Sequence, residues 1–161
     1  MALNPYDVMH VVESHLKVLG SIKRVQIGEP KAPPLDVLTA SIRMGGIRTP
    51  STVLDAPVRV YDVIVQLYRN ALDDGTRTET EMARAVGEVM EEFDGDFTLR
   101  GNSRAVDIGG IYGPAVEAVW GNLDFGNTMM RTVEITVPII IDPSATFENS
   151  AFTAGFSEGF A

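Results

Sequence analysis

Residues 131–142 read Arg-Thr-Val-Glu-Ile-Thr-Val-Pro-Ile-Ile-Ile-Asp, and this stretch decides the fold. Every second residue in it is β-branched and apolar: Val133, Ile135, Val137 and Ile139. The residues between them are mostly polar, so the period of two predicts a strand with one buried face and one face toward water. Pro138 falls on the second face and has no N–H to donate to a ladder. We therefore expect one side of this strand to be a sheet edge, at least locally.

Residues 58–68 predict a second long strand. One of its faces carries only apolar side chains, namely Tyr61, Val63, Val65 and Leu67. The other face is apolar at Val60 and Ile64, which indicates a more central strand than the first. We place both strands in one sheet. Shorter strands are predicted at residues 21–27, 35–44, 104–111 and 116–123, with a short extended piece at 97–99.

Two helices are predicted from apolar residues at helical spacing. The first begins after Asn4, a good N-cap residue, with Pro5 at the first helical position. The second covers residues 78–93 and begins with a capping box formed by Thr78 and Glu81. The predicted order is therefore α-β-β-β-α-β-β-β. Because so few helices cannot cover both faces of a parallel sheet, we predict an α+β fold: an antiparallel-rich mixed β-sheet with the two main helices packed against it.

The composition is that of one ordinary globular domain. The chain has 161 residues, of which 45% are hydrophobic and 22% are charged. We expect residues 1–143 to form a single domain and residues 144–161, where the helix and strand patterns stop, to form a C-terminal tail. No apolar run approaches the ~20 residues that a membrane helix needs. The N-terminus shows no basic and apolar signal segment, so we expect no targeting peptide.

The net charge of −9 and the absence of cysteine argue against several functions. Duplex DNA binding needs clustered Lys and Arg to neutralise phosphates, so we expect no specific DNA binding. Without cysteine there is no disulfide framework, no thiol catalysis and no thiolate metal site. The simplest role of the negative charge is solubility.

No motif for catalysis, cofactor binding or metal binding is recognisable. His10 and His15 are five residues apart, whereas a spacing of four is needed to place both imidazoles on one helix face. Residues 94–96 read Asp-Gly-Asp, like the start of a calcium loop, but Leu99 occupies the position where that loop requires Gly. Residues 109–113 read Gly-Gly-Ile-Tyr-Gly and lack the spacing and the lysine of a phosphate loop. We therefore expect no enzyme, no cofactor and no metal.

Two segments are candidates for contact with other proteins. Residues 45–57 contain two glycines and two prolines and predict a hairpin loop that is longer than a turn requires, a kind of loop that commonly serves function. The candidate interface residues from this region are Arg43, Ile47, Arg48, Val53 and Leu54. The tail contributes Phe147, Phe152, Phe156 and Phe160. We expect the tail to be mobile in the isolated subunit and to dock on a neighbouring subunit or another partner upon assembly.

Four strings, in this order along the chain, carry a family resemblance. They are Glu-Glu-Phe-Asp-Gly-Asp-Phe-Thr-Leu at 91–99, Val-Asp-Ile-Gly-Gly-Ile-Tyr-Gly at 106–113, Trp-Gly-Asn-Leu at 120–123 and Arg-Thr-Val-Glu-Ile-Thr-Val-Pro-Ile-Ile-Ile at 131–141. With the opening helix and the connector Arg-Val-Gln-Ile-Gly-Glu-Pro-Lys at 24–31, residues 5–143 resemble the tail terminator family of long-tailed, siphovirus-type phages, the minor tail protein U type. The phenylalanine-containing tail lies outside this resemblance.

The resemblance implies a virion structural protein, made in the host cytoplasm, that forms a homo-hexameric ring on the finished tail tube. Such a ring ends tube polymerisation, contacts the tail tube protein and offers a joining surface to head-completion and connector proteins at the neck. DNA would pass through its channel without specific binding, and the acidic balance suits a channel that repels phosphates. Two alternatives stay open: another neck component, such as a head-closure or tail-completion protein, and a small-molecule-binding α+β module.

Overall fold

A computed structural model describes residues 4–34, 36–50, 59–71, 75–94, 98–99, 102–103, 106–107, 110 and 113–141. For residues 98–99 and 102–103 it describes the backbone alone. Val53, Leu54 and the four phenylalanines of the predicted tail lie outside the described residues, so the expectations about them stay predictions.

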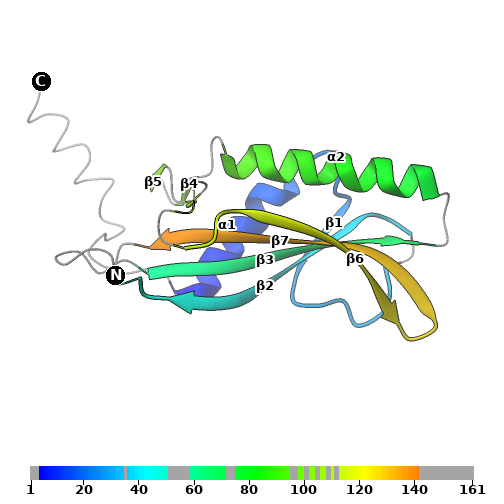
Figure 1. Cartoon of the computed structure of the whole chain (residues 1–161), viewed down its shortest axis with the longest axis horizontal. Helices are drawn as coiled ribbons and strands as arrows, with labels where there is room; N and C mark the ends of the chain where they lie inside the picture. The colour runs from blue at the N-terminus through cyan, green and yellow to red at the C-terminus, as the bar shows by residue number, and fades with distance from the viewer. Residues whose placement is uncertain are drawn as a thin grey trace, which may run out of the picture.

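A five-stranded sheet forms the body of the described chain (Figure 1). Its strands lie in the order β1 (Arg24–Ile27), β2 (Thr39–Arg48), β3 (Arg59–Asn70), β7 (Thr128–Ile141) and β6 (Glu117–Phe125). β1 and β2 are parallel, and the other neighbours are antiparallel. Two short strands, β4 (Thr98–Leu99) and β5 (Asn102–Ser103), pair with each other outside this sheet. The predicted α+β fold with an antiparallel-rich mixed sheet is confirmed.

Two helices, α1 (Pro5–Lys17) and α2 (Gly75–Asp94), cover one face of the sheet (Figure 1). α1 packs over β1 and β2, and α2 packs over β3 and β7. The side chain of Asn4 accepts a hydrogen bond from the backbone N–H of Asp7 at 2.8 Å, so the predicted N-cap is confirmed. Each helix turns an apolar stripe toward the sheet; its buried members include Val8, Val12 and Leu16 on α1 and Met82, Val89 and Phe93 on α2.

The two strands with the strongest sequence patterns, β3 and β7, are direct neighbours, and β3 is the middle strand of the sheet. Their register places Val63 opposite Val137 and Val65 opposite Ile135. All four side chains are fully buried in the core. Burying an aliphatic side chain of this size contributes ~1.5–3 kcal/mol, so this cross-strand layer is a major source of stability. The predicted alternation in both strands is confirmed.

β7 lies between β3 and β6 and is not an edge strand, but no described strand pairs with Pro138 on the side away from β3, so the expected edge is only local. The β6–β7 ladder ends at the pair of Glu117 and Thr136, two residues before the proline. The carbonyl of Pro138 accepts a hydrogen bond from the N–H of Asp107 at 2.9 Å, on the side of β7 that faces away from β3. Because the N–H and C=O of one strand residue point to the same side in an antiparallel ladder, the missing donor of Pro138 removes no hydrogen bond from the β3 pairing.

The predicted capping box is wrong, because α2 begins before Thr78. Thr78 lies inside the helix, is buried, and donates its hydroxyl hydrogen to the carbonyl of Asn70 at 3.4 Å. Glu81 forms ion pairs with Arg69 and Arg77. The S/T-x-x-E pattern therefore lies inside this helix and not at its start, and the hydroxyl of Thr78 finds its hydrogen-bond acceptor at the end of β3.

The strand predicted at residues 104–111 is also wrong for the residues described there. Val106 forms only an isolated bridge with Ile139. Gly110 has a φ of +71°, which is a left-handed conformation that interrupts an extended run. The Gly-Gly pair at 109–110 is typical of such an interruption. The prediction of a strand relied instead on the β-branched residues around the pair.

The long loop predicted at residues 45–57 starts later than expected. β2 continues as far as Arg48, so residues 45–48, the first four of the predicted loop, belong to the strand. Arg43, Ile47 and Arg48, which were selected as loop or loop-flanking contacts, are therefore strand residues paired with β3.

A β-bulge at Gly45 allows β2 to continue. The register with β3 shifts between Met44 and Gly46, which leaves Gly45 as the extra residue. A Cβ at Gly45 would lie 2.7 Å from Cδ1 of Ile64 and 3.1 Å from the carbonyl oxygen of Asp62. Glycine is thus required by the close approach of the two strands.

Replacing Gly45 by alanine should destabilise the fold by about 1–3 kcal/mol, because the new methyl group must displace Ile64 and press on a backbone oxygen. The Gly46→Ala variant is the matched control, since a Cβ there meets no atom within 4 Å. Urea denaturation of both variants measures the difference. Equal stabilities would show that the bulge does not depend on glycine.

Candidate assembly surface

β6 is the outer strand of the sheet on the side opposite to β1. It pairs with β7 along nine residues and has no described strand on its other side. Most of its residues are exposed or only partly buried. An outer strand of this length presents a row of backbone donors and acceptors that can pair with another chain.

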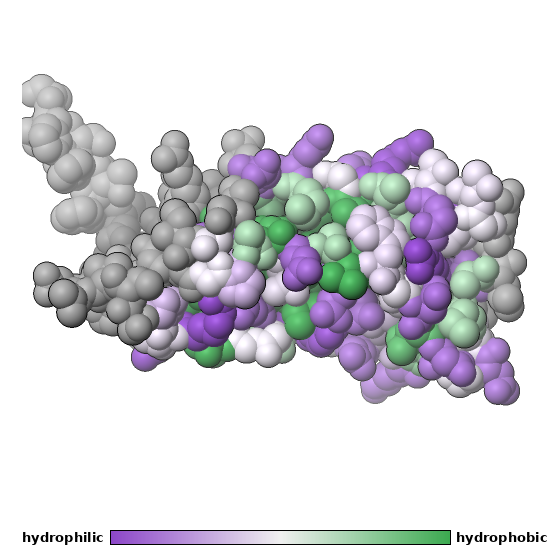
Figure 2. Space-filling view, viewed as in Figure 1, coloured by the Kyte–Doolittle hydropathy of each residue, from purple (hydrophilic) through white to green (hydrophobic). Residues whose placement is uncertain are grey.

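Large apolar side chains are concentrated on the β6–β7 hairpin. Of the seven large hydrophobic residues exposed in the described chain, four lie here: Val119 (54% exposed), Trp120 (40%), Leu123 (37%) and Met129 (43%). The register places Trp120 on the helix side of the sheet, and Val119 and Leu123 on the other side. Apolar surface is visible between α2 and β6 in the middle of the face shown in Figure 2. Exposed clusters of this kind mark sites of contact with other macromolecules.

β6 lacks the features by which edge strands avoid pairing. Its sequence from Glu117 to Phe125 contains no lysine, arginine or proline, and its two acidic residues lie at or near its ends. Lysine, proline and inward-pointing charges are the usual means of blocking an edge. Within the described part of the chain, the middle of β6 is therefore open both to hydrogen bonding and to hydrophobic contact.

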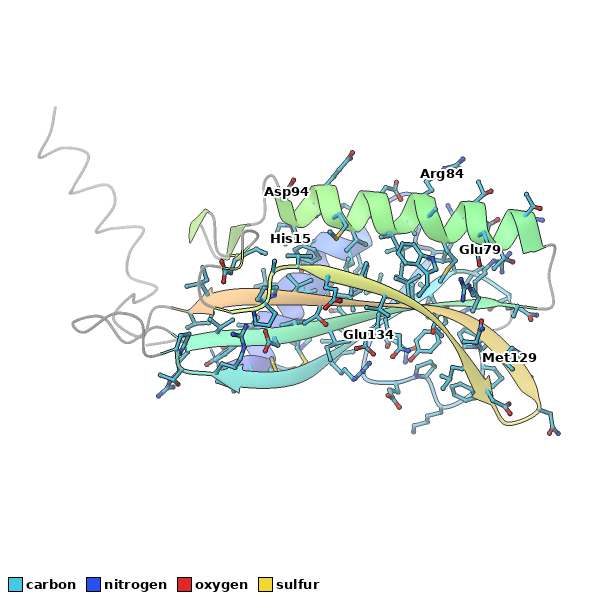
Figure 3. The ribbon with its side chains drawn as sticks, viewed as in Figure 1. His15, Glu79, Arg84, Asp94, Met129 and Glu134 are labelled. Carbon is cyan, nitrogen blue, oxygen red and sulfur yellow. The ribbon has the colours of Figure 1, made fainter. Side chains whose placement is uncertain are left out.

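The hairpin is held in a fixed position. Gly126 and Asn127 form a two-residue connection, and Gly126 has a φ of +69°, as the tight turns that match strand twist require. Arg131 on β7 donates to Glu79 on α2 at 2.6 Å and to the carbonyl of Gly121 on β6 at 3.1 Å (Figure 3). One arginine thus ties the helix to both strands of the hairpin.

The predicted interface arginines, Arg43 and Arg48, contact neighbouring strands of the same sheet. Arg43 donates to Gln66 on β3 at 2.7 Å and to Glu134 on β7 at 3.1 Å (Figure 3). Arg48 makes two hydrogen bonds, of 2.8 and 3.0 Å, to the carboxylate of Asp62. The Asp62 carboxylate raises the pKa of Arg48 above its ordinary value.

Ile47 is 51% exposed, but β3 and β7 separate its strand from β6. The structure therefore does not bring the predicted interface residues and the β6 hairpin together. The sequence did contain a signal for β6: adjacent bulky residues Val119 and Trp120 with no charge beside them. That signal identifies a strand, but only the sheet order shows that the strand is an edge.

A second feature is a small basic pocket of about 330 Å³ beside α2, lined by no residue of the β6–β7 hairpin. The turn after α1, the segment before β2, the end of β3 and the first half of α2 line it. Its ionisable side chains are Lys23, Arg69, Arg77 and Arg84, together with the carboxylates of Asp36 and Glu81. Positive charge predominates here, although the whole chain carries a net charge of −9.

Glu81 organises the charges of this pocket. One carboxylate oxygen accepts a hydrogen bond from Arg69 and the other from Arg77, each at 2.9 Å. The Arg69 side chain is only 9% exposed. Burial alone would raise the pKa of the Glu81 carboxyl, but the hydrogen bonds and charges of the two arginines outweigh burial and hold the pKa below its ordinary value.

Other groups that could support chemistry are accounted for by packing. His15 on α1 and Glu92 on α2 form a hydrogen bond of 2.7 Å between the two helices (Figure 3). Within the described part of the chain, no three His, Asp or Glu side chains gather closely enough to hold a metal ion. None of the described helices combines the length and the apolar composition that a membrane crossing requires.

Neither a protein-family model nor a curated protein sequence matches the chain. The resemblance to tail terminators therefore rests on the strings and the element order quoted above, and its implications stay proposals.

The Glu81→Gln variant should lose about 1–3 kcal/mol of stability at pH 7, because the largely buried Arg69 loses its charged partner. The folded pKa of Glu81 is lowered, so the unfolded chain binds the proton more readily. The stabilisation is therefore present above the unfolded pKa of ~4.3 and is lost as the pH falls through the folded pKa.

Denaturant unfolding between pH 7 and pH 3 measures this effect. The difference between wild type and Glu81→Gln should shrink toward acidic pH. Glu79→Gln on the same helix is the control, since its carboxylate is 53% exposed and its ion pair should contribute less than about 1 kcal/mol. A constant difference across this pH range would contradict the assignment of the lowered pKa to Glu81.

Proposed function

We propose that this protein is a structural subunit that forms a closed ring on the tail tube of a long-tailed phage, ends tube polymerisation and offers a joining surface to the head. The observation that carries the proposal is the β6 edge, which no described strand covers, with its four exposed apolar side chains on a fixed hairpin. A stable monomer has no need of such an edge, whereas an assembling subunit uses it to recognise a neighbour.

A ring follows if β6 meets a different surface of the next subunit. A head-to-tail contact of this kind closes when its rotation divides the circle, and a cap on a tube matches the symmetry of the tube. The family resemblance implies six subunits. Contact with the tube adds stability by mass action, so the ring should be more stable on tubes than in dilute solution.

The charge distribution is compatible with this role. Arg43, Arg48 and Arg131 each bind a carboxylate of the same chain, so these bases are engaged internally. With a net charge of −9, the assembled subunits would surround a channel with negative potential, which repels DNA phosphates and lets the duplex pass without sticking.

Electron microscopy of the protein mixed with tail tubes of the same phage tests the proposal directly. We expect six-fold rings at tube ends and tubes that stop growing. Wild-type protein that gives only monomers or two-fold dimers with tubes would refute the ring. Binding to the head connector without binding to tube ends would favour the other neck components.

The Val119→Lys variant should abolish ring formation, because it places a charge in the middle of the apolar edge. Val18→Lys is the matched control: Val18 is 74% exposed and lies just after α1, away from the hairpin. Both variants should fold normally by circular dichroism. Rings of normal abundance with Val119→Lys would show that β6 is not the contact.

A further inference from the structure

The charges of α2 are arranged against its helix dipole. Both of its bases, Arg77 and Arg84, lie in its first half together with Glu79 and Glu81, whereas its last two turns carry four acidic residues and no base. The first turn has no acidic residue, and the last turn has no basic one. Carboxylates at a helix C-terminus are unfavourable for the helix itself, so its own stability does not explain this arrangement.

Part of the acidic end is explained by contacts within the subunit. Glu88 accepts a hydrogen bond from the backbone N–H of Ser21 at 3.0 Å, and Glu92 is bonded to His15. Glu91 and Asp94 are exposed and form no ion pair or hydrogen bond with another described residue. Two carboxylates thus project from this end of the helix with no described partner.

The first half of α2 borders the pocket lined by Lys23, Arg69, Arg77 and Arg84. Glu81 and Asp36 neutralise part of this charge, through Arg69, Arg77 and Arg24. Arg84 is exposed and, among the described residues, has no ion-pair or hydrogen-bond partner. The pocket therefore keeps a positive excess, with Arg84 available to an incoming anion.

Both charge groups lie on one side of the helix. Arg77, Arg84 and Glu91 follow one another at intervals of seven residues, so they share a stripe and are spaced by ~10 Å along the axis. Figure 3 shows Arg84 in the middle of α2 and Asp94 at its end. One copy of the chain thus carries both a basic site and an acidic site, and each is complementary to the other site on a second copy.

We infer that the basic pocket at Arg84 binds the acidic C-terminal end of α2, at Glu91 and Asp94, of the next copy of this chain. A head-to-tail arrangement of this contact is the one that the proposed ring requires, whereas a two-fold pairing of two α2 helices would join the same charges without forming a ring. The inference rests on the proposed ring and adds to it a charge-guided contact beside the apolar β6 contact. Charge complementarity would select the partner and its orientation, and added salt would weaken it.

Charge reversal tests the contact in the full-length chain. Sedimentation of wild type at low salt should show concentration-dependent assembly that falls as sodium chloride is raised. Arg84→Glu alone and Glu91→Arg alone should each weaken assembly by about tenfold or more. An equimolar mixture of the two variants should restore it, because every junction between one variant and the other pairs opposite charges and the two can alternate around the ring.

Arg59→Glu is the control for net charge, since Arg59 is exposed and lies outside α2. It should assemble like wild type and should not rescue Glu91→Arg. Three outcomes would each overturn the inference. The mixture of Arg84→Glu with Glu91→Arg could fail to assemble, the largest species could be a two-fold dimer, or the wild-type protein could stay monomeric up to about 1 mM at low salt.

These outcomes separate the inference from the proposed function. Rings on tail tubes that tolerate Arg84→Glu would refute the α2 contact and leave the ring proposal intact. Assembly with the expected charge dependence, but without binding to tail tubes, would support the contact and refute the function.

Discussion

The pairing of β3 with β7 is the interaction on which the rest of the structure depends. The two strands are joined by a twelve-pair register, from Arg59 opposite Ile141 to Asn70 opposite Met130. One face of the pair is a continuous apolar surface that α2 covers, and α1 extends the same helix layer over β1 and β2. β2 pairs with β3 on one side of this pair, and β6 pairs with β7 on the other. The register of each outer strand is therefore set by a buried neighbour. Removing this central pair would leave the other elements without a common surface.

Arginines fix the relative positions of the elements around that centre. Arg43 joins three strands, Arg69 joins β3 to α2, and Arg131 joins β7 to α2 and to β6. Each guanidinium has several donors in a planar arrangement, which suits it to contacts in more than one direction. These three arginines are therefore engaged in contacts within the chain.

The sequence predicted those parts of the fold that depend on local periodicity. The long strands, the first helix with its Asn4 cap and the α+β class follow from the spacing of apolar residues and from one capping residue. The start of α2 was missed because Thr78 satisfies its hydroxyl on β3, a contact between segments that periodicity does not describe. The extent of β2 was missed because Gly45 and Gly46 look like a loop, although one of them is a bulge that permits two strands to approach closely. The β6 surface and the α2 charge contact depend on sheet order and on which side chains already have partners, so neither could be recognised from spacing alone.

Pro138 and Gly126 together determine where β6 sits. The glycine sets the turn at one end of the hairpin, and the proline, two residues beyond the last β6 pair, offers no donor at the other end. A longer β6 would meet a position that cannot complete the ladder, and a shifted β6 would require a different turn. The register of β6 with β7 is therefore fixed at both ends of the strand. A strand of another chain that pairs with the outer side of β6 would take its position from β6. The position of the added strand is therefore determined within one subunit before the two chains meet.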